Sequence, residues 1–243
     1  MSDRVPGRLS TAIASENARG FVAVIPDIKC ISPKEGDLLR GRNPVDVAKT
    51  LVHSGAPVLS VVTERERFGG STELLSAIAR AVNVPILRKD FITNVDQLLE
   101  TAALGAAAVL LICAITDEKN LRALYEKTLT LGIEPFVEVH TAQEMELANR
   151  LGARLIGVNN RNIVSLEKDD GGPDRTAALA SGVPTDALLI SESGILSSED
   201  AKLAAAAGAN AVLVGTALWQ ADDMGVMYQA LRVERKVASC GPL

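Results

Sequence analysis

The sequence contains few aromatic residues, cysteines and histidines. Each of these shortages restricts the kind of core, the cellular compartment or the type of site that we expect. Phe, Trp and Tyr make up 3% of the 243 residues, so the core has to be built from aliphatic side chains. Cys30, Cys113 and Cys240 are far apart with no Cys-x-x-Cys pair, which indicates free thiols in a reducing compartment. The two histidines make a metal centre a poor expectation. We expect His53 on the exterior of a helix and His140 at the surface, at a helix start.

Nothing in the sequence suggests nucleic acid, a membrane or export. The net charge is −5 and no basic stripe is present, which argues against nucleic acid as a partner. No apolar run approaches the roughly 20 residues that a membrane-spanning helix needs, and the first residues lack the apolar core of a signal peptide. We therefore expect a cytoplasmic globular protein.

What the sequence does contain is an internal repeat with a period of about 50 residues. Each copy resembles a helix end, a glycine that stops the helix, and a short apolar strand of the kind buried on both faces in a parallel sheet. The copies are SGAPVLSVV (54–62), LGAAAVLLI (104–112), LGARLIGVN (151–159) and AGANAVLVG (207–215).

Four more apolar strands fill the gaps between the repeats, at 22–28, 84–87, 134–139 and 187–191. Helical patterns follow, for example at 94–104, 117–129 and 141–151, and the expected N-caps are Ser71, Thr116, Thr141 and Ser197 or Ser198. Eight βα units predict an α/β fold, a (β/α)8 TIM barrel, with a doubly wound open sheet as the alternative. We expect one domain over 1–243, with 1–20 a short N-terminal segment and 165–174 the most flexible loop.

Polar or ionisable residues end seven of the eight predicted strands. Active sites in this fold form at the carboxyl ends of the strands, and these residues alternate as inward-pointing side chains would, so we favour one site over solvated strand ends. In strand order the residues are Asp27 and Lys29; Thr63, Glu64 and Arg65; Arg88, Lys89 and Asp90; Glu138 and His140; Asn159, Asn160 and Arg161; Ser191, Glu192 and Ser193; and Gly215 and Thr216.

The last two predicted strands lead into glycine-bearing loops, SESGI (191–195) and VLVGTAL (212–218). Loops in these positions commonly bind phosphate through backbone N–H groups, although Gly194 and Gly215 could instead only make tight turns. No nucleotide-binding fingerprint is present, so a phosphorylated metabolite is favoured over a dinucleotide. Two lysines and three carboxylates at the same rim favour acid–base chemistry, with Schiff-base formation by Lys89 as the competitor.

Seven stretches, in order, resemble the indole-3-glycerol-phosphate synthase family from about residue 20 to 232. They are IKCISP (28–33), FGGS (68–71), PILRKDFI (85–92), VEVH (137–140), IGVNNRN (156–162), ISESGI (190–195) and VLVGTAL (212–218). The resemblance implies closure of an indole ring on 1-(2-carboxyphenylamino)-1-deoxyribulose 5-phosphate, with loss of carbon dioxide and water and without a cofactor. It implies a role in tryptophan biosynthesis.

The resemblance also implies residue roles. Lys89 is similar to the general acid, Glu138 to a base or charge-stabilising carboxylate, and Lys29 to the lysine that meets the substrate carboxylate and assists dehydration. The implied catalytic set is Lys89, Glu138, Lys29, Asp27, Asn159 and Glu192. The implied substrate-binding set is Ser32, Phe68, Phe91, Arg161, Ser193, Gly194, Gly215 and Thr216, in which the two phenylalanines match aromatics that pack on the anthranilate ring.

Several features depart from the family pattern. Asp27 stands where Glu is usual, Thr216 where Ser is common, and the loop 34–43 differs; about 20 residues precede the first strand, which predicts a shortened or missing lid over the barrel mouth. These departures leave two alternatives open. One is a paralogue acting on another aminodeoxyketose phosphate. The other is a non-catalytic, phosphate-binding subunit. A homo-oligomer or a partner subunit could cover the mouth.

Overall fold

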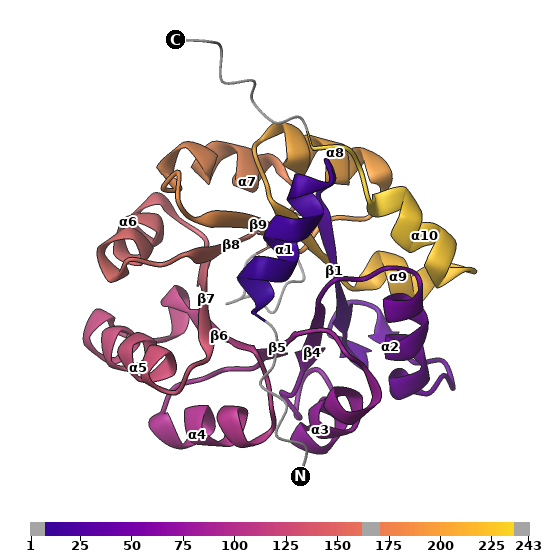
Figure 1. Ribbon diagram of the computed structural model, residues 1–243, viewed down its shortest axis with the longest axis horizontal. Helices are drawn as coiled ribbons and strands as arrows, with labels where there is room; N and C mark the ends of the chain where they lie inside the picture. The colour runs from indigo at the N-terminus through magenta and orange to yellow at the C-terminus, as the bar shows by residue number, and fades with distance from the viewer. Residues whose placement is uncertain (1–7, 162–170, 236–243) are drawn as a thin grey trace.

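The computed structural model describes residues 8–161 and 171–235. Within them, eight parallel strands close into a barrel in the order β1-β10-β9-β8-β7-β6-β5-β4 (Figure 1). The strands are β1 Ala23–Ile28, β4 Leu59–Val62, β5 Ile86–Lys89, β6 Ala108–Ile112, β7 Glu134–Val139, β8 Leu155–Asn159, β9 Leu188–Glu192 and β10 Ala211–Val214. Because β1 pairs with both β4 and β10, the sheet is closed. The TIM barrel is confirmed and the open sheet is wrong.

A ring of helices surrounds the barrel (Figure 1). In chain order these helices are α2 Pro44–His53, α3 Thr72–Ala81, α4 Val95–Ala103, α5 Glu118–Thr130, α6 Ala142–Leu151, α7 Asp174–Leu179, α8 Ser198–Ala206, α9 Thr216–Gln220 and α10 Met224–Leu231. The described residues also contain two 3₁₀ turns, η1 Cys113–Ile115 and η3 Ala180–Gly182, a small hairpin of β2 Ile31–Ser32 and β3 Gly36–Asp37, and the N-terminal helix α1 Leu9–Ala18. No helix among these elements is long and apolar enough to cross a membrane.

The predicted helix signals are largely confirmed. Ser71, Thr141 and Ser197 are N-caps whose side chains accept hydrogen bonds from the first turns of their helices. Thr116 is a wrong prediction, because Asp117 caps α5 by accepting from Asn120 N. The repeat glycines at 55, 105, 152 and 208 all have positive φ, between 75° and 105°. They therefore supply the left-handed turn that ends each helix before the next strand.

The described part of the N-terminal segment forms helix α1, Leu9–Ala18, which crosses the centre of the barrel in Figure 1. Ser10 N donates to the side chain of Glu134, the first residue of β7, at 3.1 Å, and Asn17 Nδ2 donates to Asn210 O, just before β10, at 2.8 Å. Leu9 is fully buried in the same cluster as the barrel interior. This helix therefore closes the amino end of the barrel, away from the strand ends where the lid was expected.

Some predictions lie outside the described residues. They concern Cys240, residues 1–7 of the N-terminal segment and residues 165–170 of the loop predicted to be the most flexible.

The core is aliphatic, as predicted, and one large aromatic side chain inside the barrel depends on a glycine. A Cβ atom on Gly157 of β8 would lie 2.4 Å from the Phe136 ring and 2.2 Å from Glu192 Oε1. Hydrogen in place of a side chain at position 157 therefore lets Phe136 fill the barrel directly beside the Glu192 carboxylate.

We expect Gly157→Ala to lower the free energy of unfolding by about 1–3 kcal/mol, because the added methyl group overpacks a closed core. Urea denaturation checks the prediction. Gly172→Ala is the matched control, since a Cβ atom there meets nothing within 4 Å, and its effect is expected to stay within about 0.5 kcal/mol. Equal stability of the Gly157→Ala variant and the parent protein would contradict this account of β8.

Candidate active site

Two adjoining cavities open at the carboxyl ends of the strands. The first is lined by Asp27, Lys29, Val62, Glu64, Phe68, Lys89, Asp90, Phe91, Leu110, Ile112 and Glu138. The second is lined by Asp27, Lys29, Lys89, Arg161, Ser193, Gly194, Ile195, Leu196, Leu213, Val214, Gly215 and Thr216. Asp27, Lys29 and Lys89 border both, so the three stand where the two cavities meet. The structure thus brings most of the predicted site residues to one place.

Lys89 forms an ion pair across the barrel. Its Nζ lies 2.7 Å from Oε2 of Glu192, and Glu192 is fully buried while the Lys89 side chain is 14% exposed. The two residues end β5 and β9, which are not neighbours in the barrel. A buried charge is tolerated only when it is paired, so Glu192 holds the lysine over the centre of the site. Asn159, also fully buried, is in register with Glu192 on the neighbouring strand.

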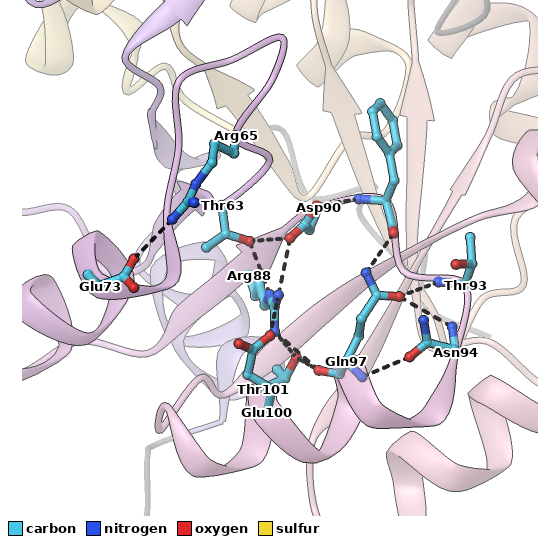
Figure 2. Close-up of polar contacts among 11 residues, drawn as sticks. Thr63, Arg65, Glu73, Arg88, Asp90, Thr93, Asn94, Gln97, Glu100 and Thr101 are labelled. Atoms are coloured by element: carbon cyan, nitrogen blue, oxygen red, sulfur yellow. Dashed lines mark hydrogen bonds and ion pairs between the residues drawn. The ribbon is translucent and has the colours of Figure 1, made fainter.

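The residue before Lys89 points the other way. Figure 2 shows Arg88 directed from β5 towards α4, and its side chain is 3% exposed. Its five N–H groups can all be satisfied: Nε donates to Thr63 Oγ1 (3.0 Å), Nη1 to Thr101 Oγ1 (3.0 Å) and Gln97 O (3.1 Å), and Nη2 to Asp90 Oδ2 (3.1 Å) and Glu100 Oε2 (2.8 Å). Arg88 therefore anchors β5 to the helix layer.

Asp90 extends this anchor to the chain beyond Lys89. Its Oδ2 accepts from Thr63 Oγ1 at 2.6 Å as well as from Arg88, and its Oδ1 accepts from Phe91 N at 2.8 Å (Figure 2). The backbone on both sides of Lys89 is thereby fixed. Of the three consecutive charges at the end of β5, one reaches across the barrel and two hold its backbone in place.

Other adjacent strand-end residues divide in the same way between the inside of the barrel and the helix layer. Asn160 is directed outward, where its Nδ2 donates to Ser191 Oγ at 3.0 Å and its Oδ1 accepts from Thr176 on α7. Glu192 is directed inward to Lys89, whereas Ser191 contacts Thr176. Side chains alternate along a strand, so Arg88, Asn160 and Ser191 belong to the supporting layer behind the site.

The first cavity has aromatic walls with a cation near each. Phe68 and Phe91 have ring centroids 6.4 Å apart. Lys29 Nζ lies 5.6 Å from the Phe68 centroid, and the Arg67 guanidinium lies 5.3 Å from that of Phe91. Sequence reasoning missed Arg67, whose only signal was its place directly before FGGS. Glu64 shapes this loop, because its Oε2 accepts from the backbone N atoms of Arg67 and Phe68. Such a cavity suits an aromatic acid.

The second cavity is lined by backbone with unusual conformation. Ser193 and Gly194 have φ of 63° and 70°, and a Cβ on Gly194 would lie 1.9 Å from Gly171 O, so only glycine fits there. Arg161 borders the cavity and its buried Nε has no hydrogen-bond partner among the described residues. An unsatisfied buried donor next to a polar cavity is a candidate group for binding an anion.

Two predicted residues have different surroundings from those expected. Ser32 lines neither cavity; its Oγ accepts from the backbone N atoms of Lys34 and Glu35 at 3.3 Å. Asp27 lines both cavities, and its Oδ1 accepts from Ser60 Oγ at 2.6 Å. The shorter carboxylate of Asp27 is therefore held against its own barrel wall.

The two histidines differ from each other. His53, the last residue of α2, is exposed as expected. His140 was expected at the surface, but its side chain is only 10% exposed and lies between the carboxylates of Glu138 and Glu144. The turn η1 and the helix α6 both contact β7, the strand that His140 follows. Within residues 8–161 and 171–235, no cluster of His, Cys, Asp and Glu could hold a metal ion.

These observations fit an α/β-barrel enzyme in which a lysine–carboxylate pair stands between an aromatic cavity and a polar cavity suited to an anion. A family model described as indole-3-glycerol phosphate synthase matches residues 4–231. Curated indole-3-glycerol phosphate synthases are similar over most of their length. That of Carboxydothermus hydrogenoformans is 40% identical over 95% of this chain and 87% of the relative; that of Pyrococcus furiosus is 42% identical over 82% and 87%. The chain belongs to the indole-3-glycerol phosphate synthase family.

A comparison with solved structures supports the fold alone. A thiamine phosphate pyrophosphorylase from Pyrococcus furiosus superposes with a TM-score of 0.64 at 13% identity, covering 88% of this chain and 96% of the other. The family resemblance seen in the seven sequence stretches is confirmed, and with it the assignment to the carbon–carbon lyases that release carbon dioxide.

We expect Asp90→Ala to lower the free energy of unfolding by about 2–3 kcal/mol, because it leaves the buried Arg88 with one carboxylate and Phe91 N without its acceptor. Urea denaturation measures the loss. Glu126→Ala, which removes an exposed carboxylate on α5, is the control and should change stability by less than about 0.5 kcal/mol. An Asp90→Ala variant as stable as that control would show that the Arg88 network does not hold β5.

Proposed function

We propose that this protein converts 1-(2-carboxyphenylamino)-1-deoxyribulose 5-phosphate to indole-3-glycerol phosphate, with release of carbon dioxide and water, in tryptophan biosynthesis. The observation that carries the proposal is the position of Lys89, which borders both cavities. This substrate has an aromatic acid at one end, a phosphate at the other and a ketone between them. Its ketone would therefore lie at Lys89.

The aromatic end of the substrate matches the first cavity. The anthranilate ring would lie between Phe68 and Phe91, with Leu110 and Ile112 below. Its carboxylate would form an ion pair with Lys29, which lies beside Phe68, and Arg67 adds a second cation beside Phe91. Ring stacking and charge pairing both favour an aromatic anion here.

The phosphate end matches the second cavity. Backbone N–H groups of Ser193, Gly194, Gly215 and Thr216 are the proposed donors, with Arg161 supplying a cation. Holding both ends of a flexible substrate brings the ring carbon and the ketone carbon together, which supplies proximity to the reaction. Asn159 and Glu192, packed side by side beneath Lys89, would set the polar floor for the ribulose hydroxyls.

The proposed chemistry proceeds in three steps by side chains alone. The ring carbon that bears the carboxylate bonds to the ketone carbon while Lys89 protonates the ketone oxygen, so the developing alkoxide is neutralised. The bond to the carboxyl carbon then breaks, and its electrons restore the aromatic ring as carbon dioxide leaves. Finally the hydroxyl leaves as water with a proton from Lys29, while Glu138 removes the proton from the adjacent carbon and the new double bond forms.

The position of Asp27 supports a second candidate function with a different substrate. Its carboxylate is fixed by Ser60 and is one methylene shorter than the glutamate usual in the resemblance, which favours a paralogue acting on another aminodeoxyketose phosphate as the runner-up. A single-domain chain, a cytoplasmic location and a homo-oligomer or partner subunit over the mouth remain predictions.

We expect Lys89→Gln and Lys89→Ala to lower turnover of the carboxyphenylamino substrate at least about 100-fold, because the general acid is lost. Formation of indole fluorescence follows the reaction, and circular dichroism checks that each variant folds. Gln can still donate to Glu192, which protects the fold if Ala does not. Lys49→Ala, on the outer face of α2, is the control and should retain full rate. Near-normal turnover by the Lys89 variants would remove this residue from the mechanism.

We expect Asp27→Glu to keep or raise turnover of the same substrate, because the longer carboxylate reaches further into the site. The same fluorescence assay, run beside the parent protein, measures kcat and KM. A loss of more than about tenfold in kcat/KM would mean that Asp27 is matched to a different substrate, and would favour the paralogue.

A further inference from the structure

His140 lies between two carboxylates, directly behind one residue of the site. Its Nε2 is 3.4 Å from Oε1 of Glu138, and its Nδ1 is 3.3 Å from Oε2 of Glu144. Glu138 is 1% exposed and lines the aromatic cavity, whereas the Glu144 side chain on α6 is 20% exposed. The imidazole ring thus connects a buried carboxylate of the site with one that reaches solvent.

The proton on the ring can be placed from these contacts. Glu144 Oε2 accepts from both His140 N, at 2.5 Å, and His140 Nδ1. Burial raises the pKa of Glu144, but the hydrogen bonds from the side chain and backbone of His140 lower it to below its ordinary value. An ionised carboxylate only accepts hydrogen bonds, so Nδ1 carries the hydrogen.

The other ring nitrogen, Nε2, then has no hydrogen to donate to Glu138. A neutral imidazole has one N–H, so with the hydrogen on Nδ1, Nε2 presents a lone pair towards Glu138 Oε1. Nε2 is buried and has no hydrogen-bond partner among the described residues. A lone pair facing a carboxylate is unfavourable, and one added proton, on Nε2 or on Glu138, turns this contact into an attraction.

The other ionisable groups near this cluster do not supply a proton between Nε2 of His140 and Glu138. Cys113, on η1, has its pKa raised to about 12 by burial and by the carboxylates of Glu144 and Glu138, so it stays a neutral thiol. Lys29 and Lys89 line the same cavity as Glu138, on the substrate side of that carboxylate. His140 contacts Glu138 and, through its other ring nitrogen, Glu144.

We propose that His140 exchanges a proton with Glu138 during catalysis and so resets this carboxylate after it has taken a proton from the substrate. The O–H bond of protonated Glu138 breaks and its electrons stay on the carboxylate; Nε2 takes the proton, and the resulting imidazolium is balanced by Glu144. When the product departs, Nε2 returns the proton through Glu138 to water in the aromatic cavity, which Glu138 lines. His140 lines neither cavity, so it is a positioning residue that acts through Glu138. The step rests on the proposed function.

The first experiment follows the ring itself in the resting protein, without any substrate. The chain has two histidines, so ¹³C-labelled histidine gives two NMR signals, and His53→Asn assigns them. We expect Glu138→Gln to move the titration midpoint of the His140 signal down by about one pH unit, because a neighbouring negative charge is lost, and to leave His53 unchanged. A His140 signal that titrates identically in Glu138→Gln and the parent protein would overturn the pairing.

The second experiment measures kcat and KM against pH for His140→Asn, in which the amide can still donate to Glu144 but nothing replaces Nε2. We expect kcat to fall about 10- to 100-fold with KM within about threefold, a changed pH profile of kcat, and partial rescue by added imidazole. His53→Asn is the matched control and should behave as the parent protein. A parental rate and pH profile, or a rate lowered equally at every pH without rescue, would overturn the proposal.

The two experiments separate the two claims. If the parent protein does not turn over the carboxyphenylamino substrate while the His140 signal still responds to Glu138→Gln, the proposed function fails and the proton-sharing pair stands. If turnover is normal and the His140 signal does not respond, the inference fails and the proposed function stands.

Discussion

The ion pair between Lys89 and Glu192 is the interaction on which the site depends. The two side chains come from strands that are not neighbours, and they meet inside the barrel at 2.7 Å. Such a pair is favourable only if both charges are held in place, because desolvation of either one alone is costly. The structure meets this condition from both sides. Arg88 and Asp90 fix the backbone of β5, and Gly157 leaves room for the Glu192 carboxylate beside Phe136.

The rest of the site follows from where this pair stands. Lys89 borders an aromatic cavity on one side and a cavity lined by Ser193, Gly194 and Gly215 on the other. A substrate that carries an aromatic acid and a phosphate would span both, with its reacting carbon atoms at the lysine. The barrel therefore contributes proximity and a preorganised cation, which are the contributions that ring closure needs most.

The strands of the barrel and the family could be predicted from the sequence, because short local sequence patterns indicate both. The glycine turns and apolar runs of the repeat predicted the strands, and the order of the seven motif stretches predicted the family. The direction of Arg88 could not be predicted. Whether a given residue at a strand end faces the barrel interior or the helices depends on the register of that strand with its neighbours. The burial of His140 accompanies the contacts of η1 and α6 with β7, and the position of α1 depends on contacts with Glu134 and Asn210 far along the chain. These three features depend on tertiary contacts with no local signature, whereas the wrong N-cap at Thr116 was a local error of one residue.

The most direct test of the central claim is a crystal structure of the protein with indole-3-glycerol phosphate bound. The account predicts the indole ring between Phe68 and Phe91, the phosphate on the backbone of Gly194 and Gly215, and Lys89 Nζ within hydrogen-bond distance of a polar atom of the ligand or of a water beside C3 of the indole. A product molecule bound with its phosphate in the aromatic cavity, or bound away from Lys89, would contradict it.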